Sequence, residues 1–339
     1  MAIIFTEGFD AYGTSPSAAN LDTYISRKWP TFSDAGGAFA LIAGRFSGRG
    51  FNPNQNRWTQ TPNFGNLTDL LVGFAFIPLS QTTDTNHFLV QLYEGSNVGM
   101  NVRLNNSGEL EVRKAGTLIA TTTGAGISLS NWYTLEFFVH THASTGTWEL
   151  RLNGVMVLSA TGADTVASSN AYYNFARIGA QGATSAHSAY DDFYCADDNT
   201  FLGSFKITTI FPNGDAGPND GTPSTGSDNY AVVDEAEPNG DTDYITDAAG
   251  DVEMFDYESI VASTVYAVAV NTVCRQDDAT PRSIILKARS GSTTDDGATQ
   301  SIGSITFQHR YDIWEENPDT SAPWTASEIN AAQFGFEVA

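Results

Sequence analysis

Short runs in which apolar and polar residues alternate dominate the chain, and segments rich in glycine and asparagine separate them. Apolar side chains fall at every second position in six such runs: 70–76, 88–92, 98–104, 110–112, 134–140 and 148–152. Alternation with a period of two predicts half-buried β-strands, because successive side chains of a strand point to opposite faces. Strands at regular short spacing predict a sandwich or barrel, so we predict an all-β fold.

One turn and one helix stand out within this pattern. Asn153-Gly154 joins the runs 147–152 and 155–159, and both residues tolerate the positive φ that a tight hairpin turn requires. The only helix that we predict begins after Thr325, near the C-terminus. Thr325 and Glu328 have the spacing of a capping box, in which each side chain accepts a hydrogen bond from the other residue's backbone N–H.

The composition excludes several classes of partner. The chain has 339 residues, with 16 Lys and Arg against 39 Asp and Glu, a net charge of −23. Binding of nucleic acid or of anionic lipid requires a basic surface, so we expect neither. No run of about 18 apolar residues occurs, so we expect no membrane insertion. The first ten residues lack the basic start of a signal peptide, so we interpret them as a first strand of a chain made in a cytosol.

The charge is unevenly distributed and suggests a domain boundary near residue 203. Residues 1–203 contain 16 acidic and 10 basic side chains, whereas residues 204–339 contain 23 and 6. Thirteen carboxylates fall between Asp215 and Glu258, in a stretch that we expect to be largely loop. Clear strand patterns return at 265–270 and 283–289, and we expect turns at 277–278 and 294–297. Cys195 and Cys274 fall in different domains, so we expect no disulfide.

Residues 1–203 resemble a concanavalin A-like (laminin-G-type) jelly-roll domain. The segments that carry the resemblance are Thr6–Tyr12, the hairpin Trp148–Val155, Arg177–Ala180 and the acidic strand Tyr190–Tyr194. The resemblance implies a jelly-roll sandwich over 1–203, followed by a smaller, β-sandwich-like acidic domain over 204–339 with the short helix at its end.

The acidic strand and the second domain also resemble a group of tailed-bacteriophage virion proteins. The matching segments include Asp191–Asp198, Ile210–Asp215, Asp241–Tyr244, Trp314–Thr320 and Trp324-Thr325. The resemblance implies a non-catalytic structural component of a phage particle, tail- or fibre-associated or decorating the head surface. The acidic domain would then serve virion attachment or subunit contacts. Other virion proteins would be its partners, a homo-oligomer such as a trimer its state, and the virion, assembled in the host cytoplasm, its location.

The sequence offers little for catalysis. Glycoside hydrolysis needs two carboxyl groups on either side of the scissile bond. Glu253 and Glu258 are five residues apart and would point to opposite faces of a strand. Glu109 and Glu111 share a face, but they follow a turn and we expect them to face solvent. His140-Thr-His142 has the spacing of two metal ligands without an evident third, so we interpret it as a strand end.

Two binding sites remain as hypotheses. Trp58, Arg57 and Asn56 combine an indole with guanidinium and amide donors in a polar loop, a mixture that suits carbohydrate recognition. Asp191 and Asp192 are candidate ligands for a structural Ca²⁺, because this cation prefers hard oxygen ligands. We expect no other cofactor.

The glycan hypothesis leads to two alternatives to a purely structural role. The first is a receptor-recognition protein, or adhesin, that binds a host surface glycan through the jelly-roll domain. The second, which the carboxylate spacing supports less, is a glycan depolymerase. Binding to polysaccharide that Trp58→Ala abolishes would favour the adhesin, whereas release of reducing sugar would favour the depolymerase.

Overall fold

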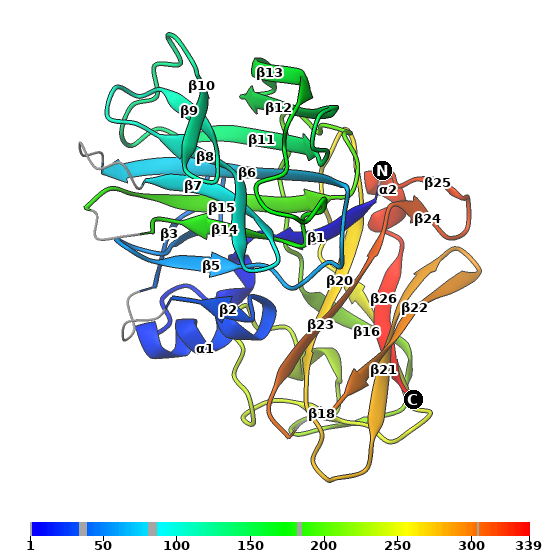
Figure 1. Cartoon of the computed structure of the whole chain (residues 1–339). Helices are drawn as coiled ribbons and strands as arrows, with labels where there is room; N and C mark the ends of the chain where they lie inside the picture. Colours follow the sequence, from blue (N-terminus) through cyan, green and yellow to red (C-terminus); the bar gives the residue numbers. More distant parts are fainter. Residues whose placement is uncertain (1, 34–38, 81–86, 182–184, 304) are drawn as a thin grey trace. The chain divides into compact units, whose positions relative to one another are not determined.

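The chain divides into two compact units in the computed structural model, which describes residues 2–33, 39–80, 87–181, 185–303 and 305–339. The first unit comprises residues 1–10 and 14–207, and the second comprises residues 11–13 and 208–339. Both are built almost entirely from antiparallel strands, so the predicted all-β class is confirmed (Figure 1).

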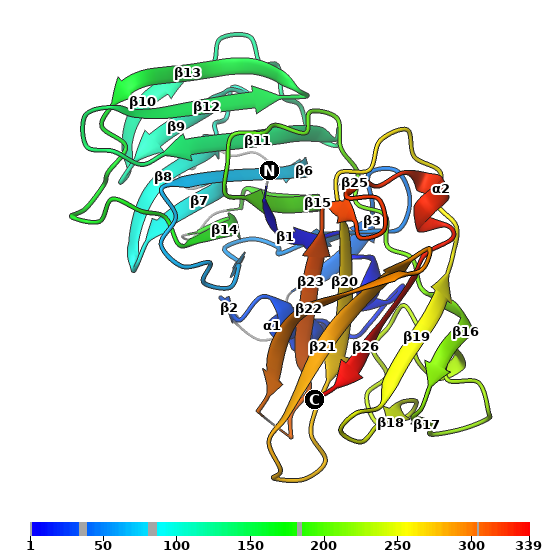
Figure 2. The same cartoon turned by 90° about the vertical axis from the view of Figure 1, so that its right-hand side faces the viewer.

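Two sheets form the first unit, and Figure 2 shows them as two layers. One sheet has the order β13 (Val155–Ala163), β12 (Gly146–Leu152), β11 (Tyr133–His140), β6 (Asp69–Ser80), β15 (His187–Ala196), β4 (Arg49–Asn52) and β3 (Ala40–Ala43), with β1 (Ile3–Glu7) also paired to β15. The other has the order β10 (Thr117–Thr121), β9 (Leu110–Lys114), β8 (Asn97–Leu104), β7 (Phe88–Glu94), β14 (Phe175–Gly179), β5 (Trp58–Gln60) and β2 (Thr31–Phe32).

The alternating pattern decides which side of each strand faces the core. In the seven-stranded sheet, Ile178, Val90, Val102 and Val112 are direct register partners across β14, β7, β8 and β9, and all four are fully buried. Their neighbours along each strand therefore point to the outer face of the sheet. The predicted Asn153-Gly154 turn is confirmed, with φ of 52° and 77° between β12 and β13.

Helix α1 (Ala18–Lys28) contradicts the expectation that the C-terminal helix is the only one. Ser17 caps it by accepting from the backbone N–H of Asn20 at 3.2 Å. Only Leu21 and Ile25 supply an apolar stripe, so the sequence signal is weak. Burial of these two side chains, rather than helix propensity, explains why the segment is helical.

The second unit contains a five-stranded sheet, three strand pairs and a short helix. The sheet has the order β16 (Pro212–Asn219), β19 (Val252–Tyr257), β26 (Gln333–Val338), β21 (Arg282–Ser290) and β22 (Thr293–Ile302). The pairs are β20 (Val268–Cys274) with β23 (Gln308–Trp314), β17 (Thr222–Pro223) with β18 (Ile245–Thr246), and β24 (Glu316–Asn317) with β25 (Ala322–Pro323). Single 3₁₀ turns lie at Asp10–Tyr12 and Tyr230–Val232.

One apolar core joins the sheet, the β20–β23 pair and helix α2 (Ala326–Ile329) of this unit. It includes Val270, Leu286, Trp314, Ile329 and Phe334. The capping box that we predicted is present: the N–H of Thr325 donates to the Glu328 carboxylate at 2.8 Å, and the N–H of Glu328 donates to Thr325 Oγ1 at 3.2 Å.

The turn that we expected at residues 294–297 is wrong, because these residues lie within β22. Each acidic side chain there has a partner on another strand. Lys287 Nζ lies 2.6 Å from Asp296 Oδ1, and the indole N–H of Trp314 donates to Asp295 Oδ2 at 2.8 Å. These tertiary contacts hold an Asp-rich segment in an extended conformation that its composition disfavours.

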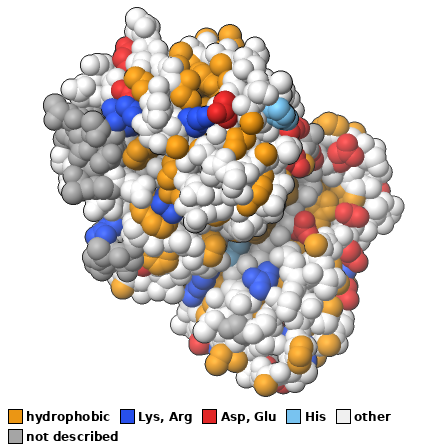
Figure 3. All heavy atoms as spheres, viewed as in Figure 1, with side chains coloured by type: hydrophobic (Ala, Val, Ile, Leu, Met, Phe, Trp, Pro, Cys, Tyr) orange, Lys and Arg blue, Asp and Glu red, His pale blue; other side chains and the backbone are white. Residues whose placement is uncertain are grey.

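The charge asymmetry of the sequence is visible on the surface. On the face drawn in Figure 3, acidic side chains gather on the second unit, whereas the first unit shows a few of both signs. Cys195 and Cys274 are both free thiols. Among the described residues, no helix combines the length and the apolarity that crossing a membrane would require.

Candidate functional site

A row of polar side chains crosses the outer face of the seven-stranded sheet. Gln60, Arg177, Gln91, Asn101 and Arg113 are direct register partners on β5, β14, β7, β8 and β9. Partners of this kind point to the same face with their Cβ atoms about 5 Å apart. The row therefore forms a continuous polar strip that spans five strands.

The middle of this strip is the floor of a hollow of about 450 Å³. Its lining is uncharged and mixed, with more apolar than polar surface: Phe88, Gln91, Asn97, Val98, Asn101, Ala115, Gly116, Ala167, Ser168 and Gln181. The volume lies in the range of small-molecule sites in proteins, which hold about 300–1,000 Å³. The hollow is therefore large enough for one sugar ring.

The two amides on the floor lack hydrogen-bond partners. The Gln91 side chain is 2% exposed and Asn101 is 0% exposed. Gln91 Oε1 and both polar atoms of the Asn101 amide have no partner in the described part of the chain. An unpaired buried polar group costs about 1–3 kcal/mol of stability. Other buried polar atoms of the described chain, such as Thr141 Oγ1 and Trp148 Nε1, also lack a partner, so this pair is distinguished by its position on the floor of the hollow.

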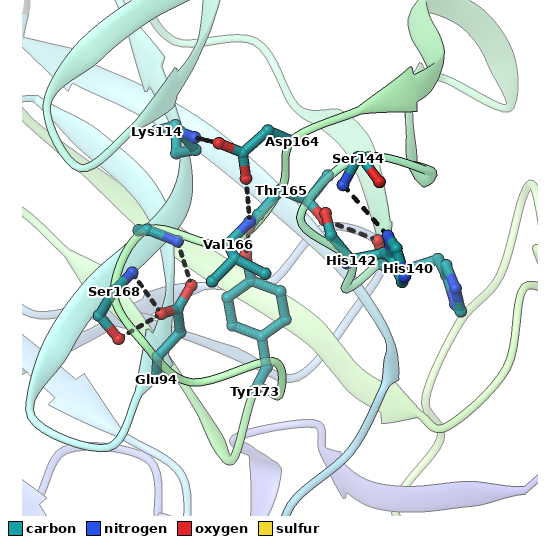
Figure 4. A network of polar contacts seen from close by, with 11 residues as sticks. Glu94, Lys114, His140, His142, Ser144, Asp164, Thr165, Val166, Ser168 and Tyr173 are labelled. Carbon is teal, nitrogen blue, oxygen red and sulfur yellow. Dashed lines mark hydrogen bonds and ion pairs between the residues drawn. The ribbon is translucent and has the colours of Figure 1, made fainter.

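The loop 164–170 forms one wall of the hollow and is held by the buried carboxylate of Glu94, at the end of β7 (Figure 4). Glu94 accepts hydrogen bonds from the backbone N–H of Ala167 at 2.7 Å and of Ser168 at 2.9 Å. The Ser168 hydroxyl donates to the same carboxylate at 2.7 Å. Three charge-assisted hydrogen bonds fix the two residues of the loop that line the hollow.

The same loop is anchored at its start by a second set of contacts, also drawn in Figure 4. Thr165 is buried, and its hydroxyl donates to the carbonyl of His140 at 2.9 Å. The Tyr173 hydroxyl donates to the carbonyl of Thr165 at 2.7 Å. These bonds make the wall rigid before any ligand arrives, and preorganisation lowers the entropic cost of binding.

His140 and His142, which have the spacing of two metal ligands, form hydrogen bonds within the protein instead. His140 Nδ1 lies 2.9 Å from Asp69 Oδ1. His142 Nδ1 accepts from the backbone N–H of Ser144 at 3.1 Å and of Thr145 at 3.0 Å. His140 lies at the end of β11, as the interpretation of a strand end requires.

An ion pair links the loop to the opposite wall of the hollow. Lys114 Nζ lies 2.5 Å from Asp164 Oδ2. Lys114 ends β9, directly before the turn residues Ala115 and Gly116 that line the hollow. Both partners are partly exposed, so the ion pair contributes little to stability, and its main effect is to hold the two walls in position relative to each other.

Trp58, one of the three predicted glycan-binding residues, lies on the same outer face, opposite Gly179 of β14. The guanidinium carbon of Arg177 lies 3.5 Å from the centre of the Trp58 ring and 4.3 Å from the centre of the Tyr93 ring. Arg177 also donates to Gln60 Oε1 at 3.0 Å. One face of the indole is therefore covered by a cation–π contact, and a sugar could stack only on the other face.

Arg57 and Asn56 precede Trp58 in the loop that enters β5. Asn56 is exposed and has a φ of 56°, whereas Arg57 is half-buried. Neither residue is among those that line the hollow. The structure thus places Trp58 beside the polar strip and leaves the other two residues at its margin.

The expectation that Glu111 faces solvent is wrong. Glu111 is buried on β9 between two arginines, with carboxylate oxygens 3.2 Å from Arg103 Nη2 and 2.9 Å from Arg113 Nε. Burial alone would raise the pKa of Glu111, but the hydrogen bonds from Arg113 and Asn105 and the charge of Arg103 hold the pKa below its ordinary value. Two guanidinium groups therefore share the one carboxylate of Glu111 on this part of the strip.

Asp191 and Asp192, the predicted calcium ligands, are both buried on β15, on the other sheet. Asp191 accepts from the backbone N–H of Arg45 and of Asp192, each at 2.8 Å. Asp192 accepts from the N–H of Ile207 at 2.8 Å, and its Oδ2 lies 3.4 Å from Arg45 Nη1. N–H donors thus occupy the oxygens that a cation would need, so these residues do not fit a Ca²⁺ site.

Hydrogen bonds from backbone N–H groups and the Arg45 guanidinium satisfy this pair. Within the described ranges, no group of three His, Cys, Asp or Glu side chains could hold a metal ion. Burial, and then the charge of Asp192, raise the pKa of Asp191 to about 8. Burial also raises the pKa of Asp192, to about 6, although the Ile207 N–H and Arg45 oppose this shift.

Sequence reasoning missed Gln91, Asn101 and Glu94 as site residues. The alternating pattern identifies positions 91 and 101 as the polar side of their strands, but most polar strand positions are exposed. In the tertiary structure both amides are buried, and loop 164–170, more than 60 residues away in the sequence, lines the same hollow through Ala167 and Ser168.

The two stacked antiparallel sheets define the class of the first unit: it is a β-sandwich of the jelly-roll type. No family model matches the sequence. No curated protein matches it either.

Several solved structures share the sandwich architecture. The cellulose-induced protein Cip1 matches 59% of this chain and 100% of its own, with a TM-score of 0.43 and 16% identity. An endo-β-1,4-glucuronan lyase from the fungus Trichoderma reesei matches 52% of this chain and 92% of its own, with a TM-score of 0.41 and 12% identity. The binding domain of Paraclostridial Mosquitocidal Protein 1 matches 59% and 49%, with a TM-score of 0.41 and 16% identity. These likenesses concern the fold alone.

Proposed function

We propose that this chain is a non-catalytic glycan-binding protein, and that the hollow on the seven-stranded sheet of its first unit holds one sugar unit. The observation that carries the proposal is the pair of buried, unpaired amides of Gln91 and Asn101 on the floor of that hollow. A ligand with hydrogen-bonding groups would satisfy them and recover the free energy that their isolation costs. Phe88 and Val98 supply an apolar surface for the carbon skeleton of the ring.

The carboxylates near the hollow support binding rather than catalysis. Glu94, Glu111 and Asp164 are each held by fixed donors or ion pairs, at 2.5–3.3 Å. A general acid or nucleophile needs a carboxyl group directed at the ligand. We therefore expect no release of reducing sugar from any glycan that the protein binds.

A glycan array probed with the labelled full chain tests this function. We expect saturable binding to at least one glycan, and loss of that binding in Asn101→Leu, which fills the floor with an apolar side chain. Asn106→Ala removes an exposed amide from the β8–β9 turn and is the matched control, with binding unchanged. Absence of binding to every glycan at millimolar concentration would refute the proposal.

Trp58 gives a second, graded test of the same face. Because Arg177 already covers one side of its ring, Trp58 would contact a second sugar unit beyond the hollow rather than the first. Trp58→Ala should therefore weaken binding of oligosaccharides while leaving monosaccharide binding unchanged. Equal loss for both ligands would contradict this order of subsites.

The phage-particle setting rests on the sequence resemblance and stays part of the proposal. Within it, the protein would be a virion component, on the tail or the head, whose glycan site serves host recognition. Antibody against this chain, imaged on negatively stained virions, tests the location. Uniform labelling of a tail or head would support it, and unlabelled virions would exclude it.

One structural feature favours the predicted homo-oligomer. Strand β13 is the end strand of its sheet, carries no charged side chain over nine residues, and exposes Val155 and Met156 by 66% and 56%. Uncharged edge strands readily pair with another strand. Light scattering of the full chain and of Met156→Lys should show a larger assembly for the wild type only. A monomeric wild type would reject the oligomer.

A further inference from the structure

We infer that Arg177 makes the site selective for acidic sugars such as uronates: the sugar ring occupies the hollow, and the guanidinium binds its carboxylate. The inference rests on the proposed function and adds the chemical class of the ligand. It follows from a guanidinium group that has no counter-charge, lies next to the floor of the hollow and is held in a fixed position.

Arg177 lacks the acidic partner that a similar arginine on the other sheet has. Arg151 Nε lies 2.6 Å from Glu149 Oε1. Arg177 forms no ion pair with any described residue, and its one hydrogen-bond acceptor among them is Gln60 Oε1, at 3.0 Å. Its Nε is buried without a partner. The protein therefore leaves much of the hydrogen-bonding capacity of this guanidinium unused.

The missing counter-charge also affects the ionisation of Arg177. Burial lowers the pKa of its guanidinium below the ordinary value, and no carboxylate in the described part of the chain opposes that shift. A carboxylate on the ligand would supply the counter-charge. Its two oxygens would also match the forked arrangement of the guanidinium N–H groups.

Arg177 lies within reach of a sugar in the hollow. It is the direct register partner of Gln91, whose side chain lines the floor. Such partners point to the same face with their Cβ atoms about 5 Å apart, which is close to the width of one sugar ring. Arg177 is half-buried, so its side chain still reaches the surface of the strip. A carboxylate on the edge of the bound ring would therefore meet the guanidinium.

Two aromatic rings hold the guanidinium in place. Its carbon lies 3.5 Å from the centre of the Trp58 ring and 4.3 Å from the centre of the Tyr93 ring. Tyr93 in turn stacks on Phe175, with 5.0 Å between the ring centres. A guanidinium stacks on aromatic rings through its flat face, so its N–H edge stays available to a carboxylate. The fixed position lowers the entropic cost of binding.

The amides on the floor accept an acidic sugar as readily as a neutral one. A side-chain amide contains both a donor and an acceptor, and either can be turned toward the ligand. Gln91 and Asn101 can therefore bind a hydroxyl group or a carboxylate, and they do not select between the two. Selection falls to Arg177.

The negative charges of the protein do not cancel this selection. Asp164 and Glu111 pair with cations at 2.5 and 2.9 Å, and both oxygens of Glu94 accept hydrogen bonds from the loop 164–170. Residues 1–203 contain 16 acidic and 10 basic side chains, so most of the net charge of −23 belongs to the remainder of the chain. Exposed charges more than about 8 Å apart are largely screened at physiological ionic strength, so the nearby guanidinium dominates.

Pairs of oligosaccharides that differ only at C6 provide the test. We would titrate the full chain with β-1,4-mannan and β-1,4-mannuronan tetrasaccharides, and with β-1,4-glucan and β-1,4-glucuronan tetrasaccharides, by calorimetry. A glycan array extends the comparison to other neutral and acidic sugars. We expect an acidic member to bind at least about tenfold more tightly than its neutral match, because it gains charge-assisted hydrogen bonds from Arg177.

Variants assign the preference to Arg177. Arg177→Gln should lower the affinity for the acidic tetrasaccharide at least about tenfold and leave the neutral affinity nearly unchanged. Arg151→Gln makes the same change of charge on the other sheet and is the matched control, with both affinities unchanged. Melting curves would show that both variants are folded. The NMR signal of the Arg177 Nε–H group should shift when the acidic sugar binds.

Each other outcome overturns a stated claim. A neutral member that binds as tightly as its acidic match, or more tightly, would refute the acidic-sugar inference and leave glycan binding intact. An acidic preference that survives Arg177→Gln, or acidic binding that survives Asn101→Leu, would place the carboxylate elsewhere and refute the inference. Absence of binding to all probes would refute both the inference and the proposed function.

Discussion

Replacing Asn101 by leucine should make the protein more stable while removing its proposed binding function. Asn101 lies on β8, and its side chain is 0% exposed with both amide atoms unpaired. Leucine has a similar branched shape, favours strands more than asparagine does, and needs no hydrogen-bond partner. The hollow beside Asn101 provides room for its extra volume.

The expected gain follows from the cost of the unpaired amide. A buried polar group without a partner costs about 1–3 kcal/mol, and the substitution removes that cost. A change of 1 kcal/mol shifts the melting temperature of a domain of this size by about 2–4 °C. We therefore expect Asn101→Leu to raise the melting temperature of the first unit by roughly 2–12 °C.

Calorimetry and urea unfolding of the full chain measure this gain, with two variants as references. Asn101→Asp has nearly the same shape but places an unpaired charge in the same buried position, so it should lower the melting temperature. Asn106→Ala, in the exposed turn after β8, should leave it unchanged. The order leucine, wild type, aspartate is the signature of an unpaired amide.

A fall in stability for Asn101→Leu would refute this reasoning. It would show that the amide is satisfied in the free protein, by water or by another group, and that the floor is not held ready for a ligand. Stabilisation together with unchanged glycan binding would contradict the assignment of the site instead.

Three further predictions concern other parts of the molecule. The pKa of Asp191 is raised to about 8 in the folded state, so this residue stabilises the fold at pH 4 and the contribution is lost as the pH rises through 8. The melting temperature of Asp191→Asn should therefore rise relative to that of the wild type between pH 4 and pH 8. A difference in melting temperature that stays constant over this range would contradict the prediction. Glu94→Gln should lower the free energy of unfolding by about 1–3 kcal/mol and speed hydrogen exchange at the backbone amides of Ala167 and Ser168. Unchanged exchange at these two amides would show that the loop does not depend on this carboxylate. Gly335→Ala should destabilise the second unit by about 3 kcal/mol in urea unfolding, because the Cβ of the new alanine would overlap the carbonyl oxygen of Glu253. An unchanged unfolding transition would show that the two strands can separate at this point.

Gly335 lies on the central strand β26, and a suitable control lies on β16, an end strand of the same sheet. At Gly214 on β16, an added Cβ would make only ordinary contacts with Asp256 at 3.7 Å. Gly214→Ala should therefore leave the unfolding midpoint nearly unchanged. Comparison of the two variants separates the effect of overlap from the general effect of replacing glycine within a strand.

The sequence by itself determined the elements whose signals are local. Alternation set strands β7, β8 and β9 of one sheet and β6, β11 and β12 of the other, together with the side of each that faces the core, because a strand places successive residues on opposite faces. Asn153-Gly154 set its hairpin, since only a few residues adopt positive φ easily. Thr325 and Glu328 set the start of α2 through contacts only three residues apart.

Only the tertiary structure decided the features that depend on distant partners. Helix α1 exists because Leu21 and Ile25 are buried, although its own pattern is weak. Asp295 and Asp296 lie in a strand rather than a turn because Trp314 and Lys287 bind them.

The candidate site belongs to the same group of features. Asn101 is a polar strand residue like many others until the tertiary structure buries it beside a hollow that the loop held by Glu94 also lines. Burial turns an ordinary amide into an unpaired one, and burial depends on chain segments that are far apart in the sequence. For this reason local patterns were sufficient for the fold of the strands and insufficient for the site.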